Sequence, residues 1–113
     1  MHEMSLCESI IQIIEDQAKT QNFHEVKTVR LEVGPFSGVE IEALRFGFDV
    51  VTKNTIAENS KLEIIETQAT AWCLNCAEQV VIKERFDACP KCNSHQLQVS
   101  SGDELRIKDL EVN

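Results

Sequence analysis

Two cysteine pairs of the form CxxC constrain the fold of this chain more than any other feature. They are Cys73-Leu74-Asn75-Cys76 and Cys89-Pro90-Lys91-Cys92, and twelve residues separate them. Each CxxC turn lets both of its sulfur atoms face one ion, and four thiolates complete a closed tetrahedral zinc site. A module this small cannot hold itself together by burial alone, and structural zinc supplies on the order of 10 kcal/mol of folding free energy. Because no coordination position is left for water, the sequence predicts a structural zinc site rather than a catalytic one.

The same four cysteines also admit two disulfides, a dithiol redox centre or an iron–sulfur centre. Disulfides conflict with a reducing compartment. A redox CxxC usually opens a helix in a βαβ unit, and the sequence shows none. An iron–sulfur centre is chemically compatible with four thiolates. A zinc ribbon serves many ends in proteins, so the pattern predicts a metal and does not by itself predict a function.

The first part of the chain predicts two helices. Apolar residues recur with helical spacing from Ser5 to about Ala18, and a capping box of Ser5 and Glu8 places residues 1–4 outside this helix. A second helix is expected at about 38–52. It follows a second capping box, in which Ser37 is the cap and Glu40 the glutamate at the third helical position.

Strands are predicted where apolar and polar residues alternate. We expect them at 29–33, from 62 to as far as 72, and at 105–112. In the last one the apolar phase shifts, and a bulge near Lys108 or Asp109 would explain that shift. Between the second and third strands, residues 69–100 hold four of the five cysteines and few large aliphatic residues. The chain therefore predicts an α+β body that is interrupted by a cysteine module.

Size and charge limit the classes of function. A chain of 113 residues makes one compact domain, or one small domain plus a module. Its net charge of −8 argues against a nucleic-acid binder, which needs a basic face to meet phosphates. No stretch is long enough to cross a bilayer, and the start lacks the charged and apolar regions of a signal peptide. We therefore expect a cytoplasmic protein without membrane partners.

The remaining cysteine and two of the histidines have ordinary interpretations. Cys7 falls on the apolar face of the first helix, where a small buried side chain is expected. His95 follows the last cysteine closely and is a candidate replacement ligand, although such a histidine is more often exposed. His24 is given no role.

The chain begins Met1-His2-Glu3, directly before the first predicted helix. The terminal amine and the His2 imidazole can reach one ion together, with the amide nitrogens of His2 and Glu3 beside them. Nitrogen donors in one plane suit Ni(II) or Cu(II) better than Zn(II), and Glu3 can add an oxygen. A lone histidine near a terminus is, however, usually solvated and without a ligand, so spacing alone leaves both interpretations open.

The opening MHEMSLCESI resembles the HypA/HybF family of hydrogenase nickel-insertion proteins. The resemblance continues through RLEVGPFSGVE, LRFGFDVV, the two cysteine pairs and the closing strand. Its specificity comes from the initial Met-His-Glu in combination with the later four-cysteine module. It implies an α+β fold with two helices on a small three-stranded mixed sheet and an inserted zinc-ribbon-like module. The implied domains are a nickel-binding domain, 1–68 with 101–113, and a zinc-binding domain, 69–100.

The resemblance also implies a function and its site residues. It implies a nickel metallochaperone, and not an enzyme, that helps insert Ni(II) into the [NiFe]-hydrogenase large subunit together with the GTPase HypB. By the family pattern His2 binds nickel, Glu3 accompanies it, and Glu40 lies near the ion. The family's structural Zn(II) ligands match Cys73, Cys76, Cys89 and Cys92. We expect a monomer or homodimer.

Other functions remain as alternatives to a carrier. A zinc-ribbon protein-interaction module without metal transport explains the cysteines and leaves Met-His-Glu to chance. A dithiol redox enzyme is a second alternative. A hydrolytic zinc enzyme is disfavoured, since four cysteines leave no place for water.

Overall fold

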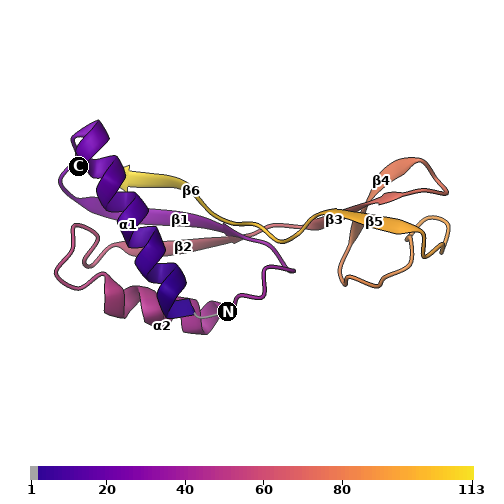
Figure 1. The fold of residues 1–113 in the computed structure, drawn as a ribbon, viewed down its shortest axis with the longest axis horizontal. Helices are drawn as coiled ribbons and strands as arrows, with labels where there is room; N and C mark the ends of the chain where they lie inside the picture. Colours follow the sequence, from indigo (N-terminus) through magenta and orange to yellow (C-terminus); the bar gives the residue numbers. More distant parts are fainter. Residues whose placement is uncertain (1–2) are drawn as a thin grey trace. The chain divides into compact units, whose positions relative to one another are not determined.

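Two three-stranded sheets organise the chain in the computed structural model, which describes residues 3–113 (Figure 1). In chain order the elements are α1 (Glu3–Gln21), β1 (Val26–Val33), α2 (Ile41–Val51), β2 (Lys61–Glu66), β3 (Ala69–Cys73), β4 (Glu78–Ile82), β5 (Leu97–Ser101) and β6 (Leu105–Val112). One sheet has the order β2-β1-β6 and the other β4-β3-β5. The described residues form two compact units, of which the first holds 3–31, 39–64 and 107–113 and the second holds 32–38 and 65–106.

Helix α1 begins at Glu3, so the predicted cap at Ser5 is wrong and Ser5 lies inside the helix. The first turn is held from the side by α2. A Cβ added at Gly47 would lie 3.2 Å from the Cys7 Sγ and 3.6 Å from the Met4 Cα. This close approach accounts for the helical conformation of Glu3 and Met4. At the other end α1 runs to Gln21, past the predicted end, and Asn22 follows it in the left-handed conformation with a φ of 57°.

Helix α2 begins at Ile41, and Glu40 is its N-cap rather than its third residue as predicted. The cause lies at Gly38, whose φ of 77° is left-handed and cannot belong to a right-handed helix. The helix therefore starts later than Ser37 would allow. The carboxylate of Glu40 takes over the capping role and accepts hydrogen bonds from the N–H groups of Glu42 and Ala43.

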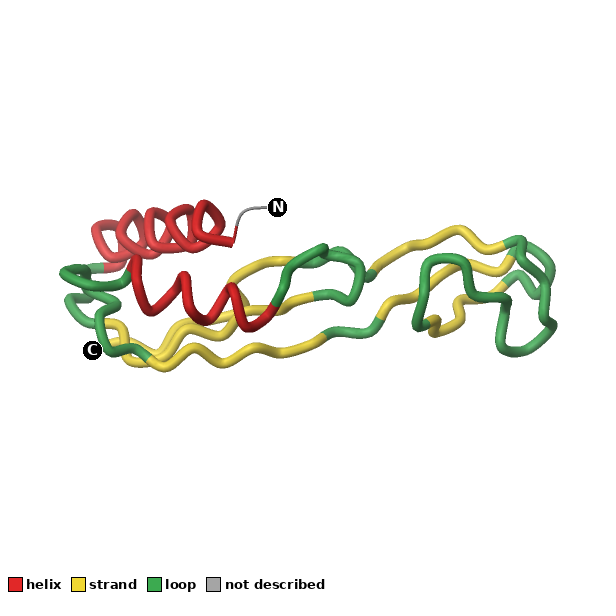
Figure 2. Tube along the Cα trace, turned by 90° about the horizontal axis from the view of Figure 1, so that it is seen from below, coloured by secondary structure: helices red, strands yellow, loops and turns green. Residues whose placement is uncertain are grey.

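The first unit buries its core between the helices and one face of the sheet. Figure 2 shows both helices of this unit on the same side of its strands. The fully buried side chains on this side include Ile14 of α1, Leu31 of β1 and Phe48 of α2. Strand β6 pairs beside β1, so the closing segment belongs to the same sheet as β1 and β2. The predicted fold class, with two helices on a three-stranded sheet and an inserted module, is confirmed.

The single strand expected from 62 to 72 is wrong. It is instead β2 and β3, which belong to different sheets and are separated by Thr67 and Gln68. The N–H of Thr67 bonds to the carbonyl of Val33, after which the chain enters the second sheet. There β3 pairs antiparallel with β4 and with β5, and the sequence did not predict β5.

The second unit has a small core of its own. Its buried residues are Ala69, Ala71, Cys73, Val80, Ile82 and Cys89. Phe36, from the segment 32–38, packs against this core and donates its N–H to the carbonyl of Gly102 at 2.6 Å. Two of the six core residues are cysteines, so the stability of this unit depends on their chemistry.

Strand β6 shows the predicted phase shift in its burial. Leu105, Ile107 and Leu110 are half-buried, whereas Lys108 and Asp109 are both exposed. The bulge itself and the division into domains 1–68 with 101–113 and 69–100 stay predictions. Among the described residues, no helix is both long enough and apolar enough to cross a bilayer.

Candidate metal centre

The two cysteine turns are built alike. The N–H of Ala77 donates to the carbonyl of Cys73 at 2.8 Å, and the N–H of Asn93 donates to the carbonyl of Cys89 at the same distance. Ala77 and Asn93 both have left-handed backbones, with φ of 54° and 63°. A left-handed residue directly after each pair turns the chain back on itself and leaves both sulfurs of the pair on one side.

The four sulfur atoms converge on one point. The Sγ atoms of Cys73, Cys76, Cys89 and Cys92 all lie within 4.8 Å of one another. The Sγ–Sγ distance is 3.6 Å between Cys73 and Cys92 and 4.0 Å between Cys76 and Cys89. A tetrahedral ion with metal–sulfur bonds of about 2.3 Å holds its sulfurs about 3.8 Å apart. The arrangement therefore fits one tetrahedral ion, and all four cysteines are free thiols rather than disulfides.

The second sheet positions both turns. Cys73 ends β3 and pairs with Glu78 of β4 on one side and Leu97 of β5 on the other. The second turn is fixed by the N–H of Cys89, which donates to the carbonyl of Ser94 at 2.8 Å. An ion pair between Lys91 and Glu78 ties this turn to β4. The sulfurs are thus held by backbone pairing on both sides.

Hydrogen bonds to sulfur prepare the site for thiolates. The N–H of Cys76 donates to the Sγ of Cys73 at 3.3 Å, and the N–H of Lys91 donates to the Sγ of Cys89 at 3.4 Å. A hydrogen bond with the Asn75 side chain, followed by one with the Ser94 backbone, lowers the pKa of Cys92 to about 6. Hydrogen bonding to Cys92, with desolvation, raises the pKa of Cys76 to about 12. An ion that binds here displaces the remaining protons.

Sequence reasoning missed the support around the sulfurs. Asn75 and the left-handed residues Ala77 and Asn93 were not singled out. Residue type gave only a weak signal. Asparagine is common in the left-handed conformation, which indicates a turn at Asn93, but alanine is not, so the sequence gives no indication of the turn at Ala77. His95 is exposed and lies outside the cluster of metal-competent side chains that the described residues form.

A second group of predicted site residues meets at the start of the two helices. The Glu3 Oε2 accepts a hydrogen bond from the N–H of Glu40 at 3.3 Å. Glu3 is the first residue of α1, and Glu40 caps α2, so this hydrogen bond joins the starts of the two helices. Met1 and His2 lie outside the described residues. The structure therefore places the Glu3 carboxylate against the Glu40 backbone, and the nickel site itself stays a prediction.

Cys7 lies close to this group but is sequestered. Its side chain is fully buried, as predicted, and its Sγ donates to the carbonyl of Leu44. Burial, followed by the charges of Glu3 and Glu8, raises the pKa of Cys7 to about 11. The thiol therefore stays protonated near neutral pH and serves as packing.

The whole chain matches one protein family. A family model described as hydrogenase/urease nickel incorporation, metallochaperone, hypA matches residues 1–112. A hydrogenase maturation factor HypA of Alkalilimnicola ehrlichii is 60% identical over 112 residues, which cover 99% of each chain. One of Acidithiobacillus ferrooxidans is 59% identical over 112 residues, again with 99% of each chain covered.

Solved structures agree on the fold. The solution structure of the Ni metallochaperone HypA from Helicobacter pylori matches with a TM-score of 0.72. The two chains are 24% identical, and the match covers 99% of this chain and 97% of that one. A second structure, described as the solution structure of HypA protein, matches with a TM-score of 0.75 at 23% identity over 100% of this chain and 97% of that one.

Proposed function

We infer that this chain, which belongs to the HypA family of hydrogenase and urease nickel-incorporation metallochaperones, takes up Ni(II) at its amino-terminal end. The family match spans residues 1–112, so it includes both the start of the chain and the four cysteines. The chain is accordingly a nickel metallochaperone of hydrogenase maturation. An interaction module without metal transport is not favoured, because relatives of the same length are hydrogenase maturation factors.

His2, Glu3 and Glu40 form the nickel site in this proposal. The observation that carries it is the 3.3 Å hydrogen bond from the Glu40 backbone N–H to the carboxylate of Glu3. Glu3 directly follows His2 in the sequence. An imidazole with nearby carboxylates offers nitrogen and oxygen donors, which Ni(II) accepts. A site of few side chains at the start of a helix can release its cargo, which a carrier requires.

Cys73, Cys76, Cys89 and Cys92 would hold Zn(II), which supplies folding free energy to the second unit. The support is the fit of their sulfur spacing to one tetrahedral ion. Their enclosure counts against a carrier role, because four sulfurs leave no open position through which the ion is easily passed on. The nickel-binding domain would be 1–68 with 101–113, and the zinc-binding domain 69–100.

The partners that we propose are the GTPase HypB and the [NiFe]-hydrogenase large subunit, with the chain itself a monomer or homodimer. Membership of a hydrogenase maturation family supports this choice. The chain would act in the cytoplasm, where the free thiols stay reduced. It would act as a carrier without catalysis of its own, and it would bind neither nucleic acid nor membrane.

Calorimetric titration with Ni(II) tests the nickel site. The variant His2→Ala should raise the nickel Kd by at least about tenfold, since it removes a nitrogen ligand. His24→Ala is the matched control, because His24 is exposed and far from α1's start in the sequence. Zinc content is measured on each sample and should not change. Equal nickel affinity in His2→Ala and the unchanged chain would remove the proposal.

A further inference from the structure

The outer edge of β6 is unpaired. In the sheet order β2-β1-β6, the neighbour of β6 is β1, and no described strand lies on the other side. The backbone bonds of Asn113, just beyond β6, also run toward the start of β1, to His24 and Glu25. An eight-residue edge strand presents a row of free N–H and carbonyl groups that another strand can bind.

The charges of β6 are divided between its two halves. The first half carries Arg106 and Lys108, and the second half carries Asp109 and Glu111. Apolar residues alternate with these charges, namely Leu105 and Ile107 in the first half and Leu110 and Val112 in the second. Reversed end to end, the strand therefore places each basic residue opposite an acidic one and each apolar residue opposite another.

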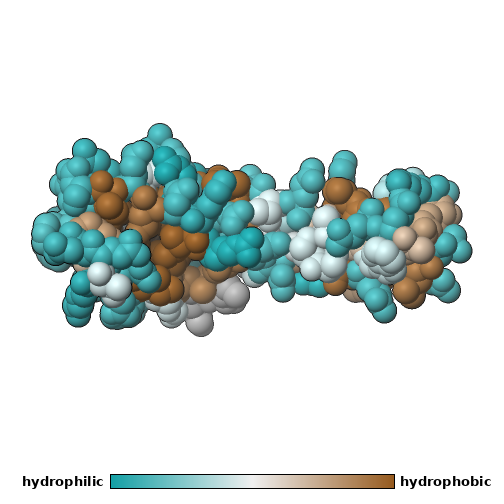
Figure 3. All heavy atoms as spheres, turned by 90° about the horizontal axis from the view of Figure 1, so that it is seen from above, coloured by the Kyte–Doolittle hydropathy of each residue, from teal (hydrophilic) through white to brown (hydrophobic). Residues whose placement is uncertain are grey.

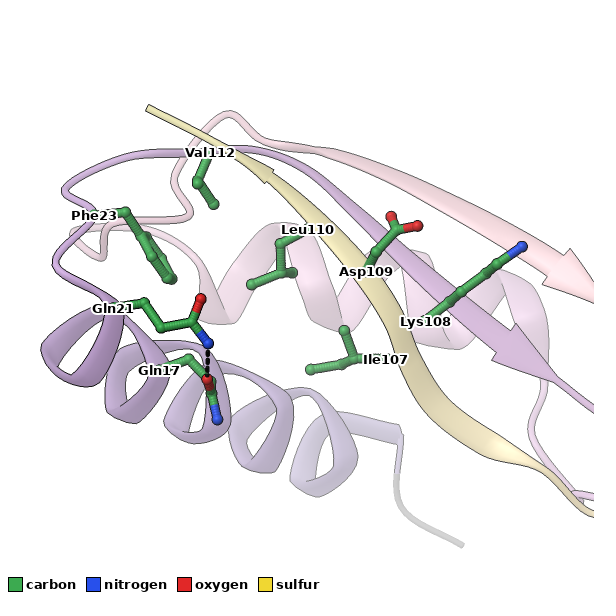
Figure 4. Close-up of a pocket in the computed structure, with 8 residues that line it drawn as sticks. All are labelled: Gln17, Gln21, Phe23, Ile107, Lys108, Asp109, Leu110 and Val112. Carbon is green, nitrogen blue, oxygen red and sulfur yellow. Dashed lines mark hydrogen bonds between the residues drawn. The ribbon is translucent and has the colours of Figure 1, made fainter.

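The phase shift puts these partners on matching faces. Figure 4 shows Ile107 and Leu110 directed toward the α1 side of the strand, while Lys108 and Asp109 point away from it. In an antiparallel pair, residues directly opposite each other share a face. Ile107 opposite Leu110 and Lys108 opposite Asp109 both satisfy this rule.

We propose that β6 is a self-complementary interface, at which a second copy of this chain adds its own β6 in antiparallel register with Lys108 opposite Asp109. Each contact then occurs twice about the two-fold axis, including Ile107 with Leu110 and Arg106 with Glu111. A parallel arrangement in register would place like charges opposite each other, which is unfavourable. The charge order thus selects both the direction and the register.

A groove beside β6 supplies apolar surface for the second copy. Its volume is about 320 Å³, and it lies between the last turns of α1 and β6 (Figure 4). It is lined by Gln17, Gln21, Phe23, Ile107, Leu110 and Val112, with Lys108 and Asp109 on the strand. Figure 3 shows apolar side chains gathered between polar ones on this part of the first unit. Leu110 of the second copy, opposite Ile107, would cover this apolar strip.

The acidic half of the strand is already held in place. Arg30 of β1 forms ion pairs with Asp109 at 2.8 Å and with Glu111 at 3.6 Å, so both carboxylates are held on one face of the sheet. Within residues 3–113, Lys108 is the one charged side chain of β6 that has no ion-pair partner. A second copy provides that partner in Asp109, whose carboxylate has further lone pairs to accept from Lys108.

Sedimentation equilibrium of the full-length, zinc-loaded chain tests the interface. Lys108→Glu places two repulsive pairs at the two-fold axis and should raise the dimer Kd by at least about tenfold. Lys53→Glu carries the same charge change on an exposed loop residue of the same unit and should leave the Kd unchanged. Mixing Lys108→Glu with Asp109→Lys restores opposite charges at both contacts, so the mixture should associate about as well as the unchanged chain.

Three results would overturn the proposal. One is an unchanged chain that stays monomeric up to about 1 mM, which would leave the edge to a strand of another protein. Another is a dimer whose Kd responds equally to Lys108→Glu and Lys53→Glu. The third is a mixture that associates no better than Lys108→Glu alone, with helical circular dichroism confirming that both variants are folded.

Discussion

The Oε2 atom of Glu3 lies 3.3 Å from the backbone nitrogen of Glu40 and accepts its hydrogen bond, although the two residues are 37 positions apart in the sequence. Each residue stands at the start of a helix, where a carboxylate is stabilised by the positive end of the helix dipole. Glu40 also uses both of its oxygens to cap α2. The acidic side of the proposed nickel site is therefore part of the helix architecture.

Glu40 should have separable roles in stability and in nickel binding. Glu40→Ala removes the cap of α2 and should lower the free energy of unfolding by about 1 kcal/mol. Glu40→Gln keeps an oxygen that can accept from the α2 N–H groups and should lose less stability, while its nickel Kd rises because the charge is gone. Urea unfolding followed by helical circular dichroism measures the first effect, and calorimetry the second. A Glu40→Ala variant as stable as the unchanged chain would contradict the capping role.

Gly47 should tolerate alanine only when Cys7 makes room. The added Cβ would lie 3.2 Å from the Cys7 Sγ, which is fully buried and bonded to Leu44. Gly47→Ala alone should therefore destabilise the first unit by roughly 1 kcal/mol, since overpacking outweighs the better helix propensity. In a Cys7→Ala background the same change should stabilise it by up to about 1 kcal/mol. A double-mutant cycle by urea unfolding gives both values, and additive effects would contradict the contact.

The left-handed residues of the two cysteine turns should respond oppositely to a swap. Ala77→Asn places a residue that accepts φ near 54° and should stabilise the second unit by up to about 1 kcal/mol. Asn93→Ala places an alanine at a position with a φ of 63°, which is unfavourable for alanine, and should destabilise the unit by a similar amount. The fluorescence of Trp72, which is half-exposed in β3, can follow unfolding during competition with a zinc chelator. Equal stability of the two variants would show that these turns are not strained.

Acid should weaken the first unit partly through Glu63. Hydrogen bonding to Arg30, at 2.9 Å, lowers the pKa of Glu63 below its usual value of 4.5. The stabilisation is therefore present above pH 4.5 and is lost as the pH falls through the lower folded-state pKa. Glu63→Gln should flatten this part of the stability curve, and Glu58→Gln, at an exposed position of the same unit, should not. Helical circular dichroism reports on the first unit alone, because both helices belong to it.

Periodicity in the sequence located the helices and the body strands, because long apolar faces leave a regular pattern. The helix starts were misplaced for two different reasons. Contact with Gly47 extends α1 past Ser5, and this is a tertiary effect that no local motif encodes. The left-handed backbone of Gly38 delays α2, so that a glutamate caps it where a serine was expected.

The second unit was harder to predict strand by strand. The four cysteines fixed its location, since metal spacing is read directly from the chain. Strand β5 was missed because LQVSS has only two large apolar residues, and its place is secured by polar contacts such as Thr70 with Ser100 and Ser101. The support of Cys92 by Asn75 also depends on the folded turn rather than on a sequence pattern.

Ala77 and Asn93, which follow the two cysteine turns, have a consequence for the order in which the four-cysteine site forms during synthesis. Asparagine adopts the left-handed backbone conformation of Asn93 readily, whereas the same conformation is unfavourable for Ala77. The pair that leaves the ribosome first is thus the less ready to close. We therefore expect the turn of Cys89 and Cys92 to form before the turn of Cys73 and Cys76. The four-cysteine site would then be completed only after the second pair has left the ribosome.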